Sequence, residues 1–165
     1  MTNFELITNQ VKAELDKISS ENQSFIDENH TKTFYFESTI NDSNIDVYVN
    51  IFKEFEYLRI ALHLPLIVPM DKRVEVANYF FEQNEYLSYG TFLFSIETGR
   101  ISLKSDINFQ NLDFPVNEDY FSTHLEDCID LLNTTYPALM QLIYSSLDPK
   151  FLINRFVGKQ RVIYN

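Results

Sequence analysis

The sequence predicts an α+β domain: a five-stranded antiparallel sheet with helices on one face, in the order α-βββ-α-ββ-α, plus a short C-terminal helix or tail. Three observations predict it. Apolar residues recur at helical spacing in the first 20 positions and then alternate along three runs between positions 33 and 64. The connections between those runs are only a few residues long, so neighbouring strands form hairpins and are antiparallel. A second helical pattern, one more hairpin and a long helical pattern follow, which indicates an α+β fold with no parallel β-α-β units.

The first helix is predicted from a single apolar stripe with spacings of 3, 4, 4 and 3, formed by Phe4, Ile7, Val11, Leu15 and Ile18. Thr2 and Glu5 have the spacing of a capping box. The polar run 21–32 is predicted to be a loop.

Three strands are predicted at 33–38, 44–52 and 56–64. Each alternates between apolar and polar side chains, as expected for a sheet with one buried face. In the third run the polar side of the alternation is formed by Tyr57, Arg59, Ala61 and His63. Pro65 and Pro69 are predicted to end this strand.

A second helix is predicted over 70–84, with the stripe Val74, Ala77, Phe80 and Phe81. The run 91–104 predicts a hairpin with a turn at Thr98-Gly99. Asn117 is predicted to cap a long helix whose stripe is Phe121, Leu125, Cys128, Leu132, Tyr136, Leu139 and Ile143. Pro137 lies inside this pattern, so we expect a kink near Asn133 or a break into two helices.

Length and charge limit the classes of function. A chain of 165 residues is the size of one domain, and we assign residues 1–147 to that domain and 148–165 to a basic, apolar tail. Subtracting the four positive charges of residues 150–165 from the net charge of −11 leaves −15 on residues 1–149. Such an acidic body repels phosphate, which disfavours nucleic-acid binding. The single cysteine and the absence of a long apolar run favour a reducing, cytoplasmic setting without a membrane span.

The sequence lacks the motifs that carry recognisable chemistry. His30, His63 and His124 share no zinc-ligand spacing with one another or with Cys128, and the acidic residues lack calcium-loop spacing. No phosphate-binding, nucleophile-elbow or metalloprotease motif occurs. We therefore expect no enzyme activity, no cofactor and no metal, and we interpret Cys128 as a buried structural thiol.

Four stretches support a family resemblance: LHLPLIVPMDKR, VEVANYFFEQN, GTFLFSIETGRISLKS and VNEDYFSTHLEDCIDLL. Through these stretches, residues 60–143 resemble YbjN-domain proteins, which adopt the fold of the type III secretion chaperones. The resemblance implies a compact domain that commonly dimerises and presents a surface to another polypeptide. Type III chaperones are small, acidic and dimeric, and they hold an effector segment in extended form. The basic, apolar tail departs from that pattern, so chaperone activity itself does not carry over.

Two surfaces and the tail are the candidates for binding. The polar face of the sheet is the candidate protein-binding surface, with Tyr48, Tyr57, Arg59 and His63. A candidate acidic docking face, for a basic partner or for the chain's own tail, is formed by Glu118, Asp119, Glu126 and Asp130. The alternatives are an ordinary surface histidine at position 63 and a solvated acidic helix face. The tail is interpreted as an arm that docks on the acidic body, or alternatively as an ordinary final helix and strand.

These observations favour a non-catalytic protein-binding module, chaperone-like or a regulatory adaptor, acting as a homodimer. One alternative is a small-ligand-binding domain with an aromatic pocket between sheet and helices. Another is an acidic immunity-type inhibitor of a basic protein.

Overall fold

The computed structural model describes residues 2–18, 24–28, 30–110, 117 and 119–145. The tail, residues 148–165, and the final helix predicted there lie outside the described residues. The elements are α1 (Asn3–Ile18), β1 (Ser24–Glu28), β2 (Thr31–Ile40), β3 (Ser43–Phe52), β4 (Tyr57–Ile67), the 3-10 helix η1 (Met70–Lys72), α2 (Arg73–Asn84), β5 (Thr91–Phe94), β6 (Arg100–Asn108) and α3 (Tyr120–Tyr144).

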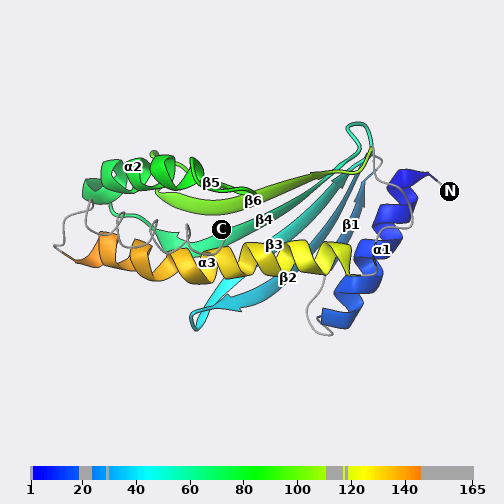
Figure 1. Cartoon of the computed structure of the whole chain (residues 1–165), viewed down its shortest axis with the longest axis horizontal. Helices are drawn as coiled ribbons and strands as arrows, with labels where there is room; N and C mark the ends of the chain where they lie inside the picture. Colours follow the sequence, from blue (N-terminus) through cyan, green and yellow to red (C-terminus); the bar gives the residue numbers. More distant parts are fainter. Residues whose placement is uncertain (1, 19–23, 29, 111–116, 118, 146–165) are drawn as a thin grey trace.

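The predicted fold class is confirmed. Six antiparallel strands form one sheet in the order β1-β2-β3-β4-β6-β5. All three α-helices lie on the same face: α3 runs along the sheet, α1 lies at the end near β1 and contacts α3 and β3, and α2 lies at the opposite end beside β5 (Figure 1). The apolar residues of the strands' inner faces and of the three helices form one core. No helix of the described residues lies on the other face of the sheet, and we call it the open face.

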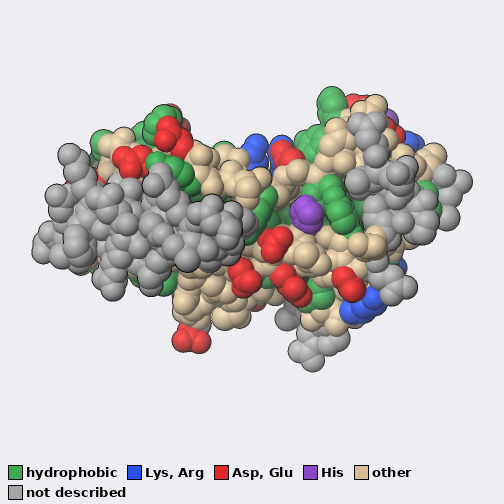
Figure 2. Space-filling model, in the orientation of Figure 1, with side chains coloured by type: hydrophobic (Ala, Val, Ile, Leu, Met, Phe, Trp, Pro, Cys, Tyr) green, Lys and Arg blue, Asp and Glu red, His purple; other side chains and the backbone are tan. Residues whose placement is uncertain are grey.

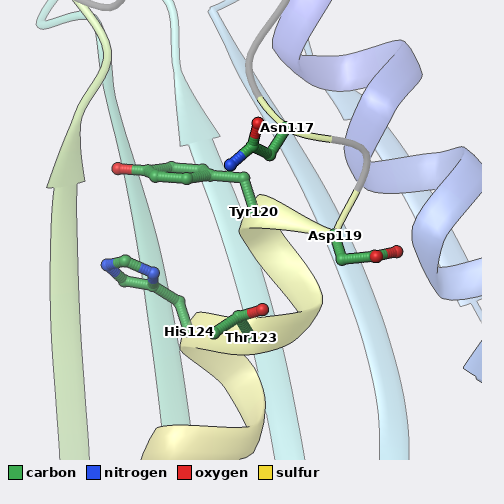
Figure 3. Close-up of a pocket in the computed structure, with 5 residues that line it drawn as sticks. All are labelled: Asn117, Asp119, Tyr120, Thr123 and His124. Atoms are coloured by element: carbon green, nitrogen blue, oxygen red, sulfur yellow. The ribbon is translucent and has the colours of Figure 1, made fainter.

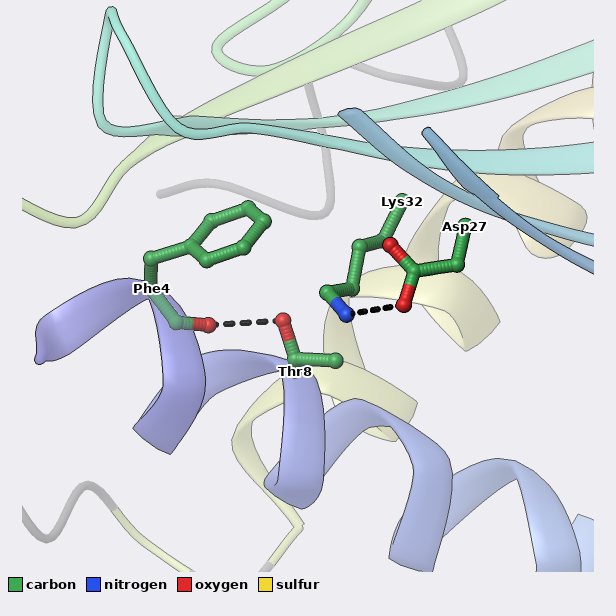
Figure 4. Close-up of polar contacts among 4 residues, drawn as sticks. All are labelled: Phe4, Thr8, Asp27 and Lys32. Carbon is green, nitrogen blue, oxygen red and sulfur yellow. Dashed lines mark hydrogen bonds and ion pairs between the residues drawn. The ribbon is translucent and has the colours of Figure 1, made fainter. Parts of the chain in front are cut away.

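The sheet has one strand more than predicted, because β1 forms within the stretch assigned to a loop. Phe25 and Ile26 point to opposite faces and are 50% and 54% exposed, so β1 has no clear buried side and no alternation that a sequence pattern reveals. Lys32 ties this edge to the first helix. Its ammonium group contacts Asp27 at 2.7 Å and lies 5.8 Å from the ring centre of Phe4 (Figure 4).

The prediction that Pro65 ends the third strand is wrong, because β4 continues to Ile67. The pairing of β4 with β6 shifts register between His63 and Ile67, and Pro65 has no ladder partner in either neighbouring strand. A proline is tolerated at such an irregularity because no hydrogen bond from its nitrogen is required there.

The capping box of α1 is confirmed. The backbone nitrogen of Thr2 donates to Glu5 Oε2 at 2.9 Å, and that of Glu5 donates to Thr2 Oγ1 at 3.3 Å. The predicted stripe is buried except for Ile18, which is 48% exposed at the end of the helix.

The cap of α3 differs from the prediction. The backbone nitrogen of Ser122 donates to Glu14 Oε2 at 2.6 Å, so a buried carboxylate of α1 caps the start of α3. Asn117 contributes its backbone carbonyl, which accepts hydrogen bonds from Tyr120 N and from Gln10 Nε2. A carboxylate at a helix N-terminus satisfies a free N–H group and interacts favourably with the helix dipole.

The predicted stripe of α2 is only partly correct. Its buried residues are Val76, Tyr79, Phe80 and Gln83, whereas Val74 and Phe81 are exposed. Apolar residues occur on opposite sides of this helix, so their spacing alone does not decide which side faces the core. The guanidinium group of Arg73 fixes the start of α2, because it donates to the backbone carbonyls of Val68, Ile96 and Glu97.

The long final helix is continuous through Pro137, so of the two predicted alternatives, a kink near Asn133 or a break into two helices, the break is wrong. Proline cannot donate to the carbonyl four residues earlier, which is that of Asn133. That carbonyl accepts a hydrogen bond from Asn41 Nδ2 at 3.1 Å instead. Asn41 lies in the turn between β2 and β3, and the neighbouring Ser43 hydroxyl is 3.3 Å from the hydroxyl of Tyr136. The hairpin thus replaces the hydrogen bond that the proline removes.

Candidate protein-binding surfaces

The open face of the sheet brings together the four residues predicted as a protein-binding surface. Tyr48 lies on β3, and Tyr57, Arg59 and His63 lie on β4, with their side chains on the open face. The residues that alternate with them are buried in the core, so the strand period determines this orientation. The four residues form two clusters rather than one.

The first cluster is a row of rings across three strands. The ring centres of Tyr35 and Tyr48 are 5.0 Å apart, and those of Tyr48 and His63 are 5.3 Å apart in an edge-on arrangement. The Tyr35 hydroxyl donates to Asp46 Oδ1 at 2.9 Å, and this hydrogen bond raises the pKa of Tyr35 to about 12. Tyr35 was not predicted as a site residue, although its place in the alternating run of β2 assigns it to this face.

The second cluster lies near the start of β4. Phe52 and Tyr57 stack with ring centres 4.5 Å apart, and the guanidinium carbon of Arg59 lies 5.3 Å from the Tyr57 ring centre. Arg59 also donates from Nε and Nη2 to the two carboxylate oxygens of Asp106, at 2.7 Å and 2.9 Å. This paired hydrogen bonding raises the pKa of Arg59 and fixes the orientation of its side chain. The predicted cation therefore already has an acidic partner on the same face.

Of the candidate acidic docking face, the structure describes Asp119, just before α3, and Glu126 and Asp130 on that helix. Asp119, Glu126 and Asp130 are exposed, and none of them forms an ion pair with another described residue. Their spacing of seven and four positions places them on one side of the helix. Figure 2 shows acidic side chains gathered over this half of α3. Glu118 lies outside the described residues.

A hollow at the start of α3 is lined by Asn117, Asp119, Tyr120, Thr123 and His124 (Figure 3). Tyr120 and His124 project to the same side with ring centres 5.0 Å apart, whereas Asp119 points away from them. The hollow is open to solvent and does not lie between the sheet and the helices. It therefore does not provide the enclosed aromatic pocket that the small-ligand alternative requires.

An apolar surface that the sequence pattern did not reveal surrounds α2. We call Met70, Val74 and Phe81 the α2 outer stripe; they are 79%, 67% and 70% exposed. Beyond the stripe, the segment between β4 and the β5–β6 turn has further exposed large apolar side chains: Ile67, Tyr86, Leu93 and Ile96. The sequence did contain one sign of this surface: the apolar residues of the predicted helix 70–84 fall on two opposite sides of that helix.

The buried thiol was predicted correctly. Cys128 is fully buried on α3, and burial raises its pKa to about 11 although the hydroxyl of Ser105 acts in the opposite direction. A neutral, inaccessible thiol packs as an apolar group and is a poor nucleophile. The described residues contain no group of three or more His, Cys, Asp or Glu side chains placed to hold a metal ion. None of the described helices is both long and apolar enough to span a membrane.

Comparison with known proteins identifies the fold but no family. No protein-family model matches the sequence, and no curated protein matches it. Among solved structures, a chain of the "Crystal Structure of the ExsC-ExsE Complex" superposes with a TM-score of 0.50 and 14% sequence identity. The alignment covers 90% of this chain and 100% of that chain. At this identity the likeness shows the fold alone: this chain shares the fold of a chain in the ExsC-ExsE complex, which is type III secretion chaperone-like.

Proposed function

We propose that this chain is a non-catalytic, chaperone-like or adaptor-like domain that binds another protein through its open face. One observation carries the proposal: the core lies on one face of the sheet, and the other face presents clustered aromatic rings that no helix of the described residues covers.

The chemistry of the open face suits a protein partner. Tyrosine and arginine are the residue types that dominate binding energies at interfaces. Here each ring is held on a strand against a neighbouring ring, and Arg59 is oriented by Asp106, so little side-chain entropy is lost when a partner binds. Both clusters lie on one sheet, which allows a single extended segment to contact both.

The structural comparison supports the same class of function. The similar structure contains ExsC in a complex with ExsE, and its matching chain has the fold seen here. We also propose that the chain is related to YbjN-domain proteins, because residues 60–143 resemble them in sequence. A homodimer as the working assembly is part of the same proposal, because that resemblance implies it.

The test is native mass spectrometry of the full-length protein purified from its own organism. We expect a homodimer that carries a second polypeptide in fixed stoichiometry. The double variant Tyr48→Ala/Tyr57→Ala is expected to lose that polypeptide while keeping its circular dichroism spectrum. Tyr144→Ala is the matched control, because Tyr144 is 66% exposed on α3. Retention of the polypeptide by the double variant would show that the open face is not the binding surface.

The acidic docking face favours a second candidate function, an inhibitor of a basic protein. The carboxylates of Asp119, Glu126 and Asp130 have no cationic partner among the described residues, so they are available to one. In that case Glu126→Lys/Asp130→Lys abolishes partner capture, and capture by the unchanged protein falls steeply with salt. Salt-independent capture would exclude this candidate.

A further inference from the structure

The outer side of α2 exposes an apolar line. Met70, Val74 and Phe81 lie within one side of the η1–α2 segment, opposite the buried Val76 and Tyr79. Side chains of this size are two-thirds or more exposed there, at 79%, 67% and 70%. Large apolar side chains exposed on one side of a helix form the kind of surface that another polypeptide segment can cover.

Unpaired carboxylates border this line. Asp71, Glu82 and Glu85 are exposed and form no ion pair with any described residue. The two cations of the segment are already engaged: Lys72 contacts Glu75 at 3.1 Å, and Arg73 donates to three backbone carbonyls. The α2 surface therefore fits a segment that is both apolar and basic.

The chain itself contains such a segment beyond α3. Residues 150–165 have no acidic residue, and their cations are Lys150, Arg155, Lys159 and Arg161. Between these lie apolar side chains that include Phe151, Leu152, Phe156, Val162 and Ile163. The segment follows directly on α3, which packs against α2. The twenty residues that follow Ser145 span up to about 66 Å when extended, whereas α2, a helix of twelve residues, is about 18 Å long. The segment is therefore long enough to reach α2.

We propose that residues 148–165 dock on the α2 outer stripe of the same chain. Their apolar side chains cover Met70, Val74 and Phe81, and their cations pair with the bordering carboxylates. The acidic docking face of α3 is the poorer site because Asp119, Glu126 and Asp130 offer charge without an exposed apolar line beside them. This proposal does not depend on partner binding, because α2 lies on the opposite side of the sheet from the open face.

The test uses the full-length chain with a nitroxide spin label on the single variant Gly158→Cys. The native Cys128 is fully buried, so labelling is confined to the introduced thiol. We expect the backbone amide signals of residues 70–85 to lose most of their intensity relative to the reduced label. Signals of residues 126–130 are expected to keep theirs. Intensity loss at 126–130 instead, or at neither segment, would overturn the proposal.

Two charge-reversal variants give a matched comparison. Asp71→Lys/Glu82→Lys is expected to restore most of the lost signal, and Glu126→Lys/Asp130→Lys, with the same change in charge, is expected to leave it unchanged. Equal effects of the two variants would mean that only net charge matters, which contradicts docking at α2.

Two further measurements separate a cis-docked tail from other occupants of the stripe. The first mixes spin-labelled chains of natural isotope content with isotope-labelled chains that carry no spin label. In that mixture, cis docking predicts no intensity loss at residues 70–85, and a loss would show that the tail of another copy binds there. By sedimentation, Val74→Asp is expected to keep the assembly state. Dissociation into monomers would show that a second copy, not the tail, covers the stripe.

Discussion

The contact of α1 with α3 and the contact of α2 with α3 differ in whether their buried polar atoms form hydrogen bonds. At the α1 contact, the buried carboxylate of Glu14 accepts hydrogen bonds from Gln10 Nε2 at 2.8 Å and from Ser122 N at 2.6 Å. At the α2 side, Tyr79 Oη and Gln83 Nε2 are buried without a hydrogen-bond partner among the described residues, as is Thr135 Oγ1 of α3. Figure 1 places these two helices at opposite ends of α3.

The difference between the two contacts shows which of them is optimised for stability. Each buried polar group without a partner costs about 1–3 kcal/mol. The α1 contact avoids that cost, whereas α2 bears it and also exposes an apolar stripe on its outer side. A helix with unsatisfied atoms inside and apolar atoms outside is not explained by stability of the fold alone. The proposed docking of the tail gives the outer side of α2 a second role.

The largest expected effect is at the α1 contact. Glu14→Leu leaves the Ser122 N–H without its acceptor and removes one of the two acceptors of Gln10 Nε2, and it is expected to lower the free energy of unfolding by about 3 kcal/mol. Glu14→Gln keeps an acceptor and loses about 1 kcal/mol. Urea denaturation measures both. Equal losses in the two variants would mean that the carboxylate packs there without capping α3.

The next effect concerns the attachment of α2. Arg73→Met removes three hydrogen bonds to backbone carbonyls and is expected to cost about 2 kcal/mol. Because these bonds fix only the start of α2, hydrogen exchange is expected to accelerate in residues 73–84 more than in α1. Uniform acceleration in both helices would mean that α2 and α1 unfold as one cooperative unit, and the contrast between them would disappear.

A smaller effect of opposite sign is expected from Tyr79→Phe. The change removes a hydroxyl that is buried without a described partner, so the free energy of unfolding is expected to rise by about 1 kcal/mol. Thermal denaturation measures it, and Thr135→Val tests the facing helix in the same way. Destabilisation by Tyr79→Phe would reveal a hydrogen-bond partner for the hydroxyl and remove the difference between the two contacts.

The last prediction is a pH dependence at Cys128. Burial raises the pKa of this thiol from 9.0 to about 11, so the unfolded chain loses the proton at a lower pH than the folded chain. The stabilising contribution is complete below pH 9 and is lost as pH rises towards 11. Unfolding midpoints at pH 8 and 10.5 for the native protein and Cys128→Ala measure it. An identical decline in both proteins would assign the effect to other groups.

The sequence was informative wherever the signal was local. The capping box of α1 and the turn at Gly99 depend on residues within a few positions, and both are present. The period of two assigned Tyr48, Tyr57, Arg59 and His63 to one face, which the strand pairing bears out. Their candidate role in binding remains a prediction.

Other features needed contacts between distant residues. That Arg59 pairs with Asp106 depends on the register between β4 and β6, and 47 positions separate the two residues. Glu14 caps a helix that begins more than a hundred positions later. The only local sign of this capping role was that Glu14 lies three positions after Val11, within the apolar stripe of the first helix. The buried side of α2 was ambiguous because apolar residues occupy two of its sides.

Pro137 has a consequence for the order in which the chain folds. A helix formed by residues 120–144 alone has no protein donor for the carbonyl of Asn133, and the turn at Asn41 supplies one from 92 positions away. The second half of this helix therefore gains its full stability only after the β2–β3 hairpin has formed and reached it. The hairpin, which is local and can form early, acts as the template on which the last helix is completed.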